Sequence, residues 1–202
     1  HFFQRSIPDS ETERILSQLR RETQNIVLIG MPGCGKSTVG AALAALTGRE
    51  AIDIDPRSEA RAGCSIPEIF AQGGEAAFRA LEQEETALAG ACSGKILLTG
   101  GGVVTVEANY ASLHQNGRIY HLLRSLDTLA TDGRPLSRGA DLAAMWQRRA
   151  PLYARFRDAE ADNNGTAEET AAAIWRDFCV HCGSERSEFE HAGHPAAGDL
   201  RT

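Results

Sequence analysis

Short apolar runs recur along the chain and alternate with segments of helical periodicity. A run of four to eight apolar residues between polar or glycine-rich stretches is typical of a buried strand. Five such runs, the last one weak, are predicted as strands: 25–30, 50–55, 95–99, 118–123 and 157–162. Four segments are predicted as helices: 36–47, 75–91, 140–156 and 166–178. This alternation predicts an α/β fold, in which helices cover both faces of a parallel sheet and ligands bind at the carboxyl ends of its strands.

The two ends of the chain do not fit this alternation. The stretch SETERILSQLRR predicts a short helix, capped by Ser10 and Glu13, that the first strand does not need. The end of the chain is polar and contains Gly and Pro, which predicts a flexible tail. The expected organisation is an N-terminal extension (1–24), one domain (25–178) and a tail (179–202).

Composition and charge exclude two classes of function. The chain of 202 residues fits one domain, and its formal net charge of −6 argues against a general nucleic-acid binder, which usually carries a basic surplus. No apolar run approaches the length that spans a membrane. The five scattered cysteines are typical of reduced cytosolic thiols. We therefore expect a cytoplasmic protein with neither nucleic-acid nor membrane partners.

A zinc site near the end of the chain stays open. Cys179, Cys182, His191 and His194 follow a C-x₂-C and H-x₂-H pattern. Zinc fingers usually space their histidines more widely, and Cys179 continues the pattern of the last predicted helix. A tail without metal is therefore the favoured interpretation.

The stretch GMPGCGKST, residues 30–38, has the spacing of a phosphate-binding loop. Gly30 is followed after four residues by Gly35, Lys36 and Ser37, between a predicted strand and a predicted helix. Glycines let consecutive backbone N–H groups face one anion. Lys36 can reach the β- and γ-phosphates of a nucleotide, and the Ser37 hydroxyl can ligate Mg²⁺.

Two carboxylates end the second predicted strand. Asp53 and Asp55 are two residues apart, so on a strand they would point to the same face. Asp53 is a candidate to hold the Mg²⁺ that accompanies a nucleotide. Asp55 is a candidate to orient or deprotonate an attacking hydroxyl.

Glycines and arginines complete the candidate site. Gly100, Gly101 and Gly102 end the third predicted strand and can form a platform that a substrate approaches closely. Arg79 has Glu82 at i+3, an ordinary pairing on a helix surface, and Arg134 lies in a Gly/Pro-bounded loop that is typical of a mobile lid. With Arg149 they can bind two anions, a nucleotide phosphate and an acidic substrate.

These motifs together resemble those of the shikimate kinases. The resemblance covers about residues 25–178 and rests on motifs in the same order and spacing: GMPGCGKST, DIDPRSE, SIPEIFAQGGEAAFRALE, TGGGVV, GRPLS and RRAPLY. It implies a three-layer kinase fold with a five-stranded parallel sheet in the order 2-3-1-4-5 and a mobile lid. It also implies phosphorylation of the shikimate 3-hydroxyl by ATP, with Mg²⁺, in the synthesis of aromatic amino acids.

The resemblance also implies roles for individual residues. ATP would bind to Gly33, Cys34, Gly35, Lys36, Ser37, Thr38 and the lid residue Arg134, and Ser37 and Asp53 would hold the metal. Shikimate would bind to Asp55, Arg79, Arg149 and the run Gly100, Gly101 and Gly102. Lys36, Asp55 and Arg134 would be catalytic; whether Asp55 removes the proton or only orients the hydroxyl stays open.

The chain departs from the family pattern in three places. The family often carries a second lid arginine, yet residues 127–133 contain none and the nearest arginine upstream is Arg124. The loop DNNGTAEE lacks an arginine often found there, so the adenine pocket stays unassigned. Because some members are fused to other shikimate-pathway enzymes, and because residue 1 is His rather than Met, residues 1–24 could come from such an upstream partner.

Three alternative functions compete with this interpretation. A related small-metabolite kinase, such as a gluconate kinase, would share the phosphate loop and the aspartate after it but would not need Arg79, Gly101 and Arg149 in this arrangement. A regulatory GTPase would carry an N-K-x-D motif, which the sequence lacks. An inactive nucleotide-binding appendage would not need Lys36 and Asp55, both of which are present.

Overall fold

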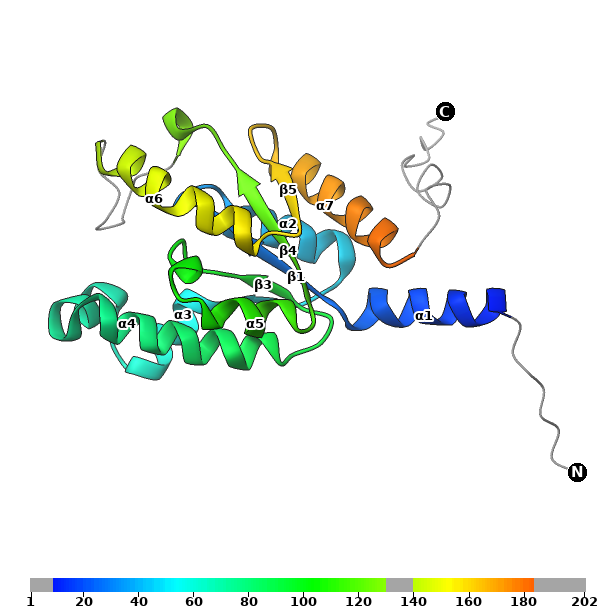
Figure 1. Cartoon of the computed structure of the whole chain (residues 1–202), viewed down its shortest axis with the longest axis horizontal. Helices are drawn as coiled ribbons and strands as arrows, with labels where there is room; N and C mark the ends of the chain where they lie inside the picture. Colours follow the sequence, from blue (N-terminus) through cyan, green and yellow to red (C-terminus); the bar gives the residue numbers. More distant parts are fainter. Residues whose placement is uncertain (1–8, 130–139, 184–202) are drawn as a thin grey trace, which may run out of the picture.

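The computed structural model describes residues 9–129 and 140–183, in which five parallel strands form one sheet (Figure 1). The strands are β1 (Asn25–Ile29), β2 (Ala51–Asp53), β3 (Ile96–Leu98), β4 (Gly117–Leu123) and β5 (Ala159–Asp162). Their order is β2-β3-β1-β4-β5, and Ile26 of β1 pairs with Ile96 on one side and Arg118 on the other. The predicted α/β fold and its strand order are confirmed.

Helices cover both faces of the sheet. On one face α2 (Lys36–Thr47) packs against α7 (Ala167–His181); on the other lie α4 (Ile66–Gly90), α5 (Ala108–His114) and α6 (Ala140–Phe156), with α3 (Ile54–Ala62) packed on α4. This division follows from the right-handedness of the crossover connections, because the direction of a connection along the sheet decides which face its helix covers. The connection from β1 runs toward the β2 edge of the sheet, whereas the connections from β2, β3 and β4 run toward the β5 edge. The connections after β1 and β4 therefore diverge, and the carboxyl ends of these strands flank a switch point where sheets of this kind bind ligands.

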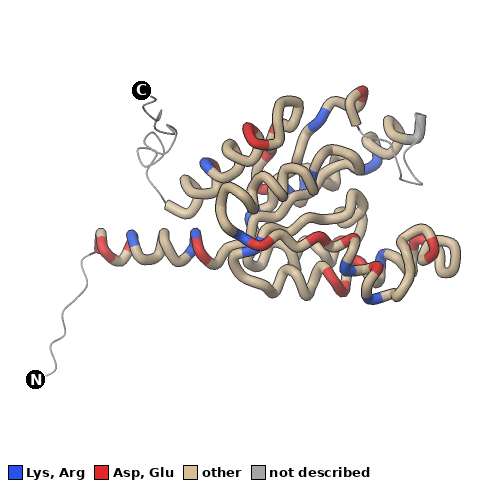
Figure 2. The backbone as a smooth tube through the Cα atoms, turned by 180° about the vertical axis from the view of Figure 1, so that it is seen from behind, with Lys and Arg blue, Asp and Glu red and all other residues tan. Residues whose placement is uncertain are grey.

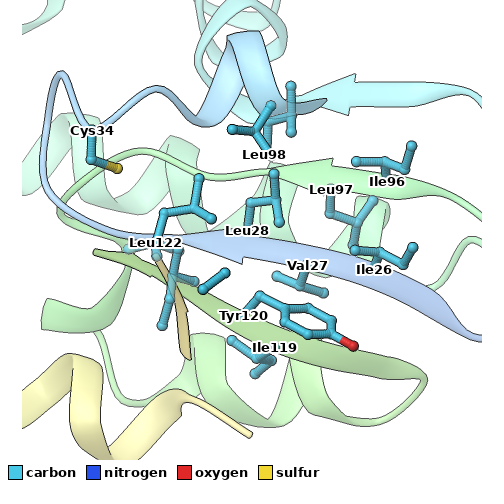
Figure 3. Close-up of a cluster of buried hydrophobic side chains, with 14 of the residues drawn as sticks. Ile26, Val27, Leu28, Cys34, Ile96, Leu97, Leu98, Ile119, Tyr120 and Leu122 are labelled. Carbon is cyan, nitrogen blue, oxygen red and sulfur yellow. The ribbon is translucent and has the colours of Figure 1, made fainter. Parts of the chain in front are cut away.

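The central strand β1 is buried along its whole length. Ile26, Val27 and Leu28 have no exposed surface, because strands flank β1 on both sides and helices cover both faces. Figure 3 shows these side chains among those of β3 and β4, with the sulfur of Cys34 directed into the same cluster. The loop after β1 therefore begins at a strand whose position is fixed by packing on all sides.

Three helical segments are not predicted by the apolar pattern. The predicted strand 50–55 ends at Asp53, whose carboxylate accepts the backbone N–H of Asp55 (3.2 Å) and caps α3. Ser65 and Glu68 fit a capping box in the sequence and form one in the structure, so α4 begins at Ile66, ahead of the predicted segment 75–91, and bends at Gly74, where φ is 69°. α3 and α5 are short, and helices of this length depend on tertiary packing rather than on their own periodicity.

The first helix, α1 (Asp9–Thr23), projects from the body of the fold (Figure 1). The helix is predicted but its predicted cap is wrong, since Ser10 lies inside the first turn. None of its residues is buried, and acidic and basic positions are interspersed along it (Figure 2). Its last turn is attached to the body: Arg49 donates to the carbonyls of Arg21 and Gln24, and the Gly94 N–H donates to that of Thr23 (2.7 Å).

The last helix extends beyond its predicted end. Thr166 and Glu169 form a capping box at the start of α7, which then runs to His181. Cys179 and Cys182 are buried in the body, so the predicted boundary between residues 178 and 179 cuts through a packed helix. His191 and His194 lie outside the described residues, and within 9–129 and 140–183 there is neither a metal-ligand cluster nor a helix long and apolar enough to cross a bilayer.

His121 of β4 is buried as a neutral ring. Its imidazole stacks on Tyr153, with 4.7 Å between ring centroids, and on Trp146, with 6.0 Å. Neither ring nitrogen has a hydrogen-bond partner within the described part of the chain. Burial, together with the positive charges of Arg157 and Lys36, lowers the pKa of His121 to about 4.

Acid should therefore destabilise the fold through His121. The unfolded chain, in which the imidazole has a pKa near 6.5, takes up a proton before the folded protein does. The His121 contribution to stability is thus complete above that pH and is lost as the pH falls toward 4, by up to about 3 kcal/mol. His121→Phe keeps the stacking and should remove this loss in urea unfolding at a series of pH values. An equal loss of unfolding free energy at low pH in the unmodified chain and in His121→Phe would contradict the assignment of this loss to His121.

Candidate active site

The loop between β1 and α2 has the backbone of an anion-binding site. Gly33 and Gly35 have φ values of 81° and 94°, a conformation that side chains disfavour, and Gly35 is the N-cap of α2. The first N–H groups of α2 therefore face outward with the positive end of its dipole. Lys36 is only 7% exposed, and its ammonium donates to the carbonyls of Gly30 (2.8 Å) and Met31 (3.0 Å).

Ser37 and Asp53 form a pair of oxygen ligands beside this loop. The Ser37 hydroxyl donates to Asp53 Oδ2 (3.4 Å), while Asp53 Oδ1 caps α3. Ser37 is exposed, so the pair is open to a ligand on the loop. A hydroxyl and a carboxylate are the hard oxygen donors that Mg²⁺ prefers, so this donor set fits a nucleotide-bound magnesium ion.

The glycine run after β3 lies directly against the phosphate loop. A Cβ atom added to Gly101 would meet Pro32 of the loop, 2.6 Å from its Cδ and 2.9 Å from its backbone nitrogen. Contacts this short exclude every side chain at residue 101. The absence of a side chain thus lets the ends of β1 and β3 meet.

Two carboxylates and an arginine surround the other glycines of the run. A Cβ atom at Gly100 would collide with Glu82 Oε1 and would lie 2.8 Å from Asp55 Oδ1, and one at Gly102 would collide with the guanidinium of Arg79. Asp55, Arg79 and Glu82 come from α3 and α4, so these helices bring their charges to the end of β3. The result is a cluster of charged side chains around the glycine run, next to the phosphate loop. We call this cluster the Gly101 pocket.

Arg79 is held by two carboxylates, one of them fully buried. Its guanidinium pairs with Glu82 Oε2 (2.5 Å) and with Glu75 Oε1 (3.0 Å). Glu82 has no exposed surface, so the pairing of Arg79 with Glu82 is not the surface pairing that the sequence predicts. Burial raises the pKa of Glu82 and the neighbouring Asp55 carboxylate adds to this, whereas Arg79 opposes it. Glu82 therefore fixes the position of Arg79 rather than solvating a helix surface.

Arg149 and Tyr153 of α6 both bind the Gly101 carbonyl. The Tyr153 hydroxyl donates to it at 2.5 Å and Arg149 Nη1 at 3.1 Å. Tyr153 is fully buried, and burial raises its pKa, so the hydroxyl stays a donor. Arg149 makes no ion pair within the described part of the chain, which leaves its charge for an anionic ligand.

The structure brings together nearly all of the site residues that the sequence predicts. Asp55, Arg79, Arg149 and the glycine run share the pocket, although Asp55 lies in the first turn of α3, so the predicted shared strand face with Asp53 is wrong. Arg134 lies outside the described residues. The buried state of Glu82 is not evident from the sequence, and neither is the role of Tyr153, although RRAPLY puts Tyr153 four residues after Arg149 on the same helix face.

Sequence comparison identifies relatives over most of the chain. A family model described as shikimate kinase matches residues 32–178. The shikimate kinase of Moorella thermoacetica is 38% identical over 162 residues, which cover 76% of this chain and 91% of that protein. That of Pseudomonas putida strain F1 is 40% identical over 144 residues, which cover 67% of this chain and 84% of that protein.

Solved structures of the same family share the fold. Shikimate kinase from Acinetobacter baumannii in complex with shikimate is similar with a TM-score of 0.76 and 31% identity, over 82% of this chain and 98% of that one. The enzyme from Aquifex aeolicus gives a TM-score of 0.67 and 27% identity, over 78% and 96% of the two chains.

Tyr153→Phe should destabilise the pocket. Loss of the hydroxyl leaves the Gly101 carbonyl with Arg149 alone, and a buried hydrogen bond of this kind contributes about 1–2 kcal/mol. Urea unfolding measures the difference. Tyr110→Phe is the matched control, because the Tyr110 hydroxyl makes no hydrogen bond within residues 9–129 and 140–183, and it should change stability by less than about 0.5 kcal/mol. Equal stabilities of the Tyr153 variant and the unmodified chain would rule out this role.

Proposed function

Because the chain belongs to the shikimate kinase family, we propose that its phosphate loop binds ATP and that the pocket around Gly101 binds shikimate. Members of this family phosphorylate shikimate with ATP on the path to aromatic amino acids, and this chain is a kinase of that kind. The observation that carries the assignment of sites is the contact of Gly101 with Pro32. With this contact, a hydroxyl bound near Gly101 can face the terminal phosphate of a nucleotide on the loop.

The charges of the pocket suit a small acid that also carries hydroxyl groups. Arg79 is offset by Glu75 and Glu82, whereas Arg149 is bonded to a carbonyl and keeps its charge. In our proposal both guanidinium groups bind the shikimate carboxylate, because arginine recognises carboxylates through paired N–H donors. The Asp55 carboxylate accepts a hydrogen bond from the reacting hydroxyl and orients it, and the Gly101 backbone binds a neighbouring hydroxyl.

On the phosphate side, the roles fall to the loop and the start of α2. Backbone N–H groups of residues 33–38 bind the phosphates, and the Lys36 ammonium stabilises the negative charge of the phosphoryl group as it transfers. Ser37 and Asp53 would hold Mg²⁺, which when bound neutralises phosphate charge. Phosphoryl transfer depends mainly on the positioning of the reactants and on neutralisation of the phosphate charge. These groups supply both contributions. Arg134 as a further phosphate ligand stays a prediction, as do a cytoplasmic location and an upstream fused domain.

Shikimate-dependent release of ADP tests the function directly. Turnover of Mg·ATP, followed by a coupled ADP assay, should require shikimate and should not occur with gluconate or without an acceptor. Lys36→Ala should reduce this turnover by at least about a thousandfold, because it removes transition-state charge. Release with gluconate alone would contradict the acceptor assignment. Release of ADP at the same rate with shikimate, with gluconate and without an acceptor would indicate that the chain hydrolyses ATP.

The role of Arg149 predicts a separation of the two substrates. Arg149→Ala should raise the KM for shikimate by about 10- to 100-fold, the equivalent of one charge-assisted hydrogen-bonded pair. The affinity for ADP, measured by calorimetry without shikimate, should stay within about twofold, since Arg149 contacts the glycine run rather than the phosphate loop. A variant that lost ADP binding and kept its KM for shikimate would reverse the assignment.

A further inference from the structure

Arg124 follows β4 at the switch point of the sheet. β4 pairs with β1 up to Ile29 and His121, so the residues after β4 lie beside the phosphate loop that follows β1. β3, with the Gly101 pocket at its end, pairs with the opposite edge of β1. The phosphate loop thus has the proposed acceptor pocket on one side and Arg124 on the other.

The Arg124 guanidinium approaches the loop where α2 begins. A Cβ atom at Gly35 would lie 3.5 Å from Arg124 Nη1 and 2.5 Å from Asn163 Nδ2. Asn163 is itself fixed, since its amide donates to the Cys34 carbonyl (2.7 Å) and accepts from the Thr170 hydroxyl (2.9 Å). Arg124 is therefore next to backbone N–H groups that bind phosphate in loops of this type.

Arg124 has no acidic partner in the described part of the chain. Its Nε atom is buried without a hydrogen bond, and the structure gives its guanidinium no ion pair there. Several arginines in the described part of the chain are paired with carboxylates, among them Arg57, Arg61, Arg79, Arg118, Arg155 and Arg157. Arg124 instead lines a cavity of about 250 Å³ with Leu126 and Asn164. A buried guanidinium nitrogen without a hydrogen-bond partner is costly, and an anionic ligand in this cavity would supply the missing acceptor.

We propose that Arg124 binds a phosphate of the nucleotide that is not transferred. This inference rests on the proposed function, which orients the transferred phosphate toward the Gly101 pocket on the β3 side. The remaining phosphates then extend toward β4, where Arg124 meets them. Because those phosphates stay in the product, Arg124 contributes to the binding of ADP as well as of ATP.

Calorimetric titration with ADP and with adenosine separates a phosphate contact from a contact to the base. Arg124→Ala should weaken ADP binding about 10- to 100-fold, the effect of one charge-assisted hydrogen bond, and should leave adenosine binding unchanged. Arg124→Lys keeps the charge but not the planar fork and should lose less. The matched control is Arg155→Ala, which removes an exposed arginine paired with Glu107 and should bind ADP like the unmodified chain.

Two results would overturn the proposal: unchanged ADP affinity in Arg124→Ala, or an equal loss for ADP and adenosine. If the alanine variant does not fold, Arg124→Gln gives the same comparison with the aliphatic stem and a polar end group kept and the charge removed. Failure of the proposed function gives a different result, in which the unmodified chain binds ADP but does not phosphorylate shikimate. The affinities of the Arg124 variants can be measured in either case.

Discussion

The close contact between the backbone of Gly101 and Pro32 is the constraint on which the site depends. It lets the loops after β1 and β3 touch, and no side chain larger than hydrogen fits between them. On one side of this contact are the N–H groups at the start of α2, and on the other are Asp55, Arg79 and Arg149. In the proposed function, the distance between the phosphoryl donor and its acceptor is therefore set by backbone geometry, which varies less than the position of a flexible side chain.

The charges of the pocket are organised by burial. Arg79 forms an ion pair with Glu82, which has no exposed surface, and a second ion pair with Glu75, which is exposed to solvent. An arginine fixed at two points loses little rotational freedom when it binds a ligand. The arrangement also keeps Asp55 and Glu82 close to each other at Gly100, where the repulsion between two carboxylates favours protonation of the more buried one.

The sequence predicts the parts of the site that depend on local spacing. The phosphate loop, the glycine run and Arg149 could be assigned because each lies at a strand end or on a long periodic helix. Asp55 was misplaced, because the strand ends at Asp53 when that residue caps α3, and apolar alternation carries no signal for this. The buried state of Glu82 could not be predicted, since a pair at i and i+3 has the same spacing on an exposed and on a buried helix face. The proximity of Arg124 to Gly35 could not be predicted either, because it depends on the pairing of β1 with β4, and local sequence patterns do not show which strands pair.

The position of Lys36 has a consequence for selectivity among anions. Its ammonium is already bonded to two carbonyl oxygens of its own loop, and these acceptors are always present at a short distance. An incoming anion shares the three N–H donors of the ammonium with these two carbonyls, which partly offset its positive charge. A carboxylate or a chloride ion offers one charge, whereas a nucleotide polyphosphate offers several. In the proposed function, this sharing favours a nucleotide over monovalent anions at the loop.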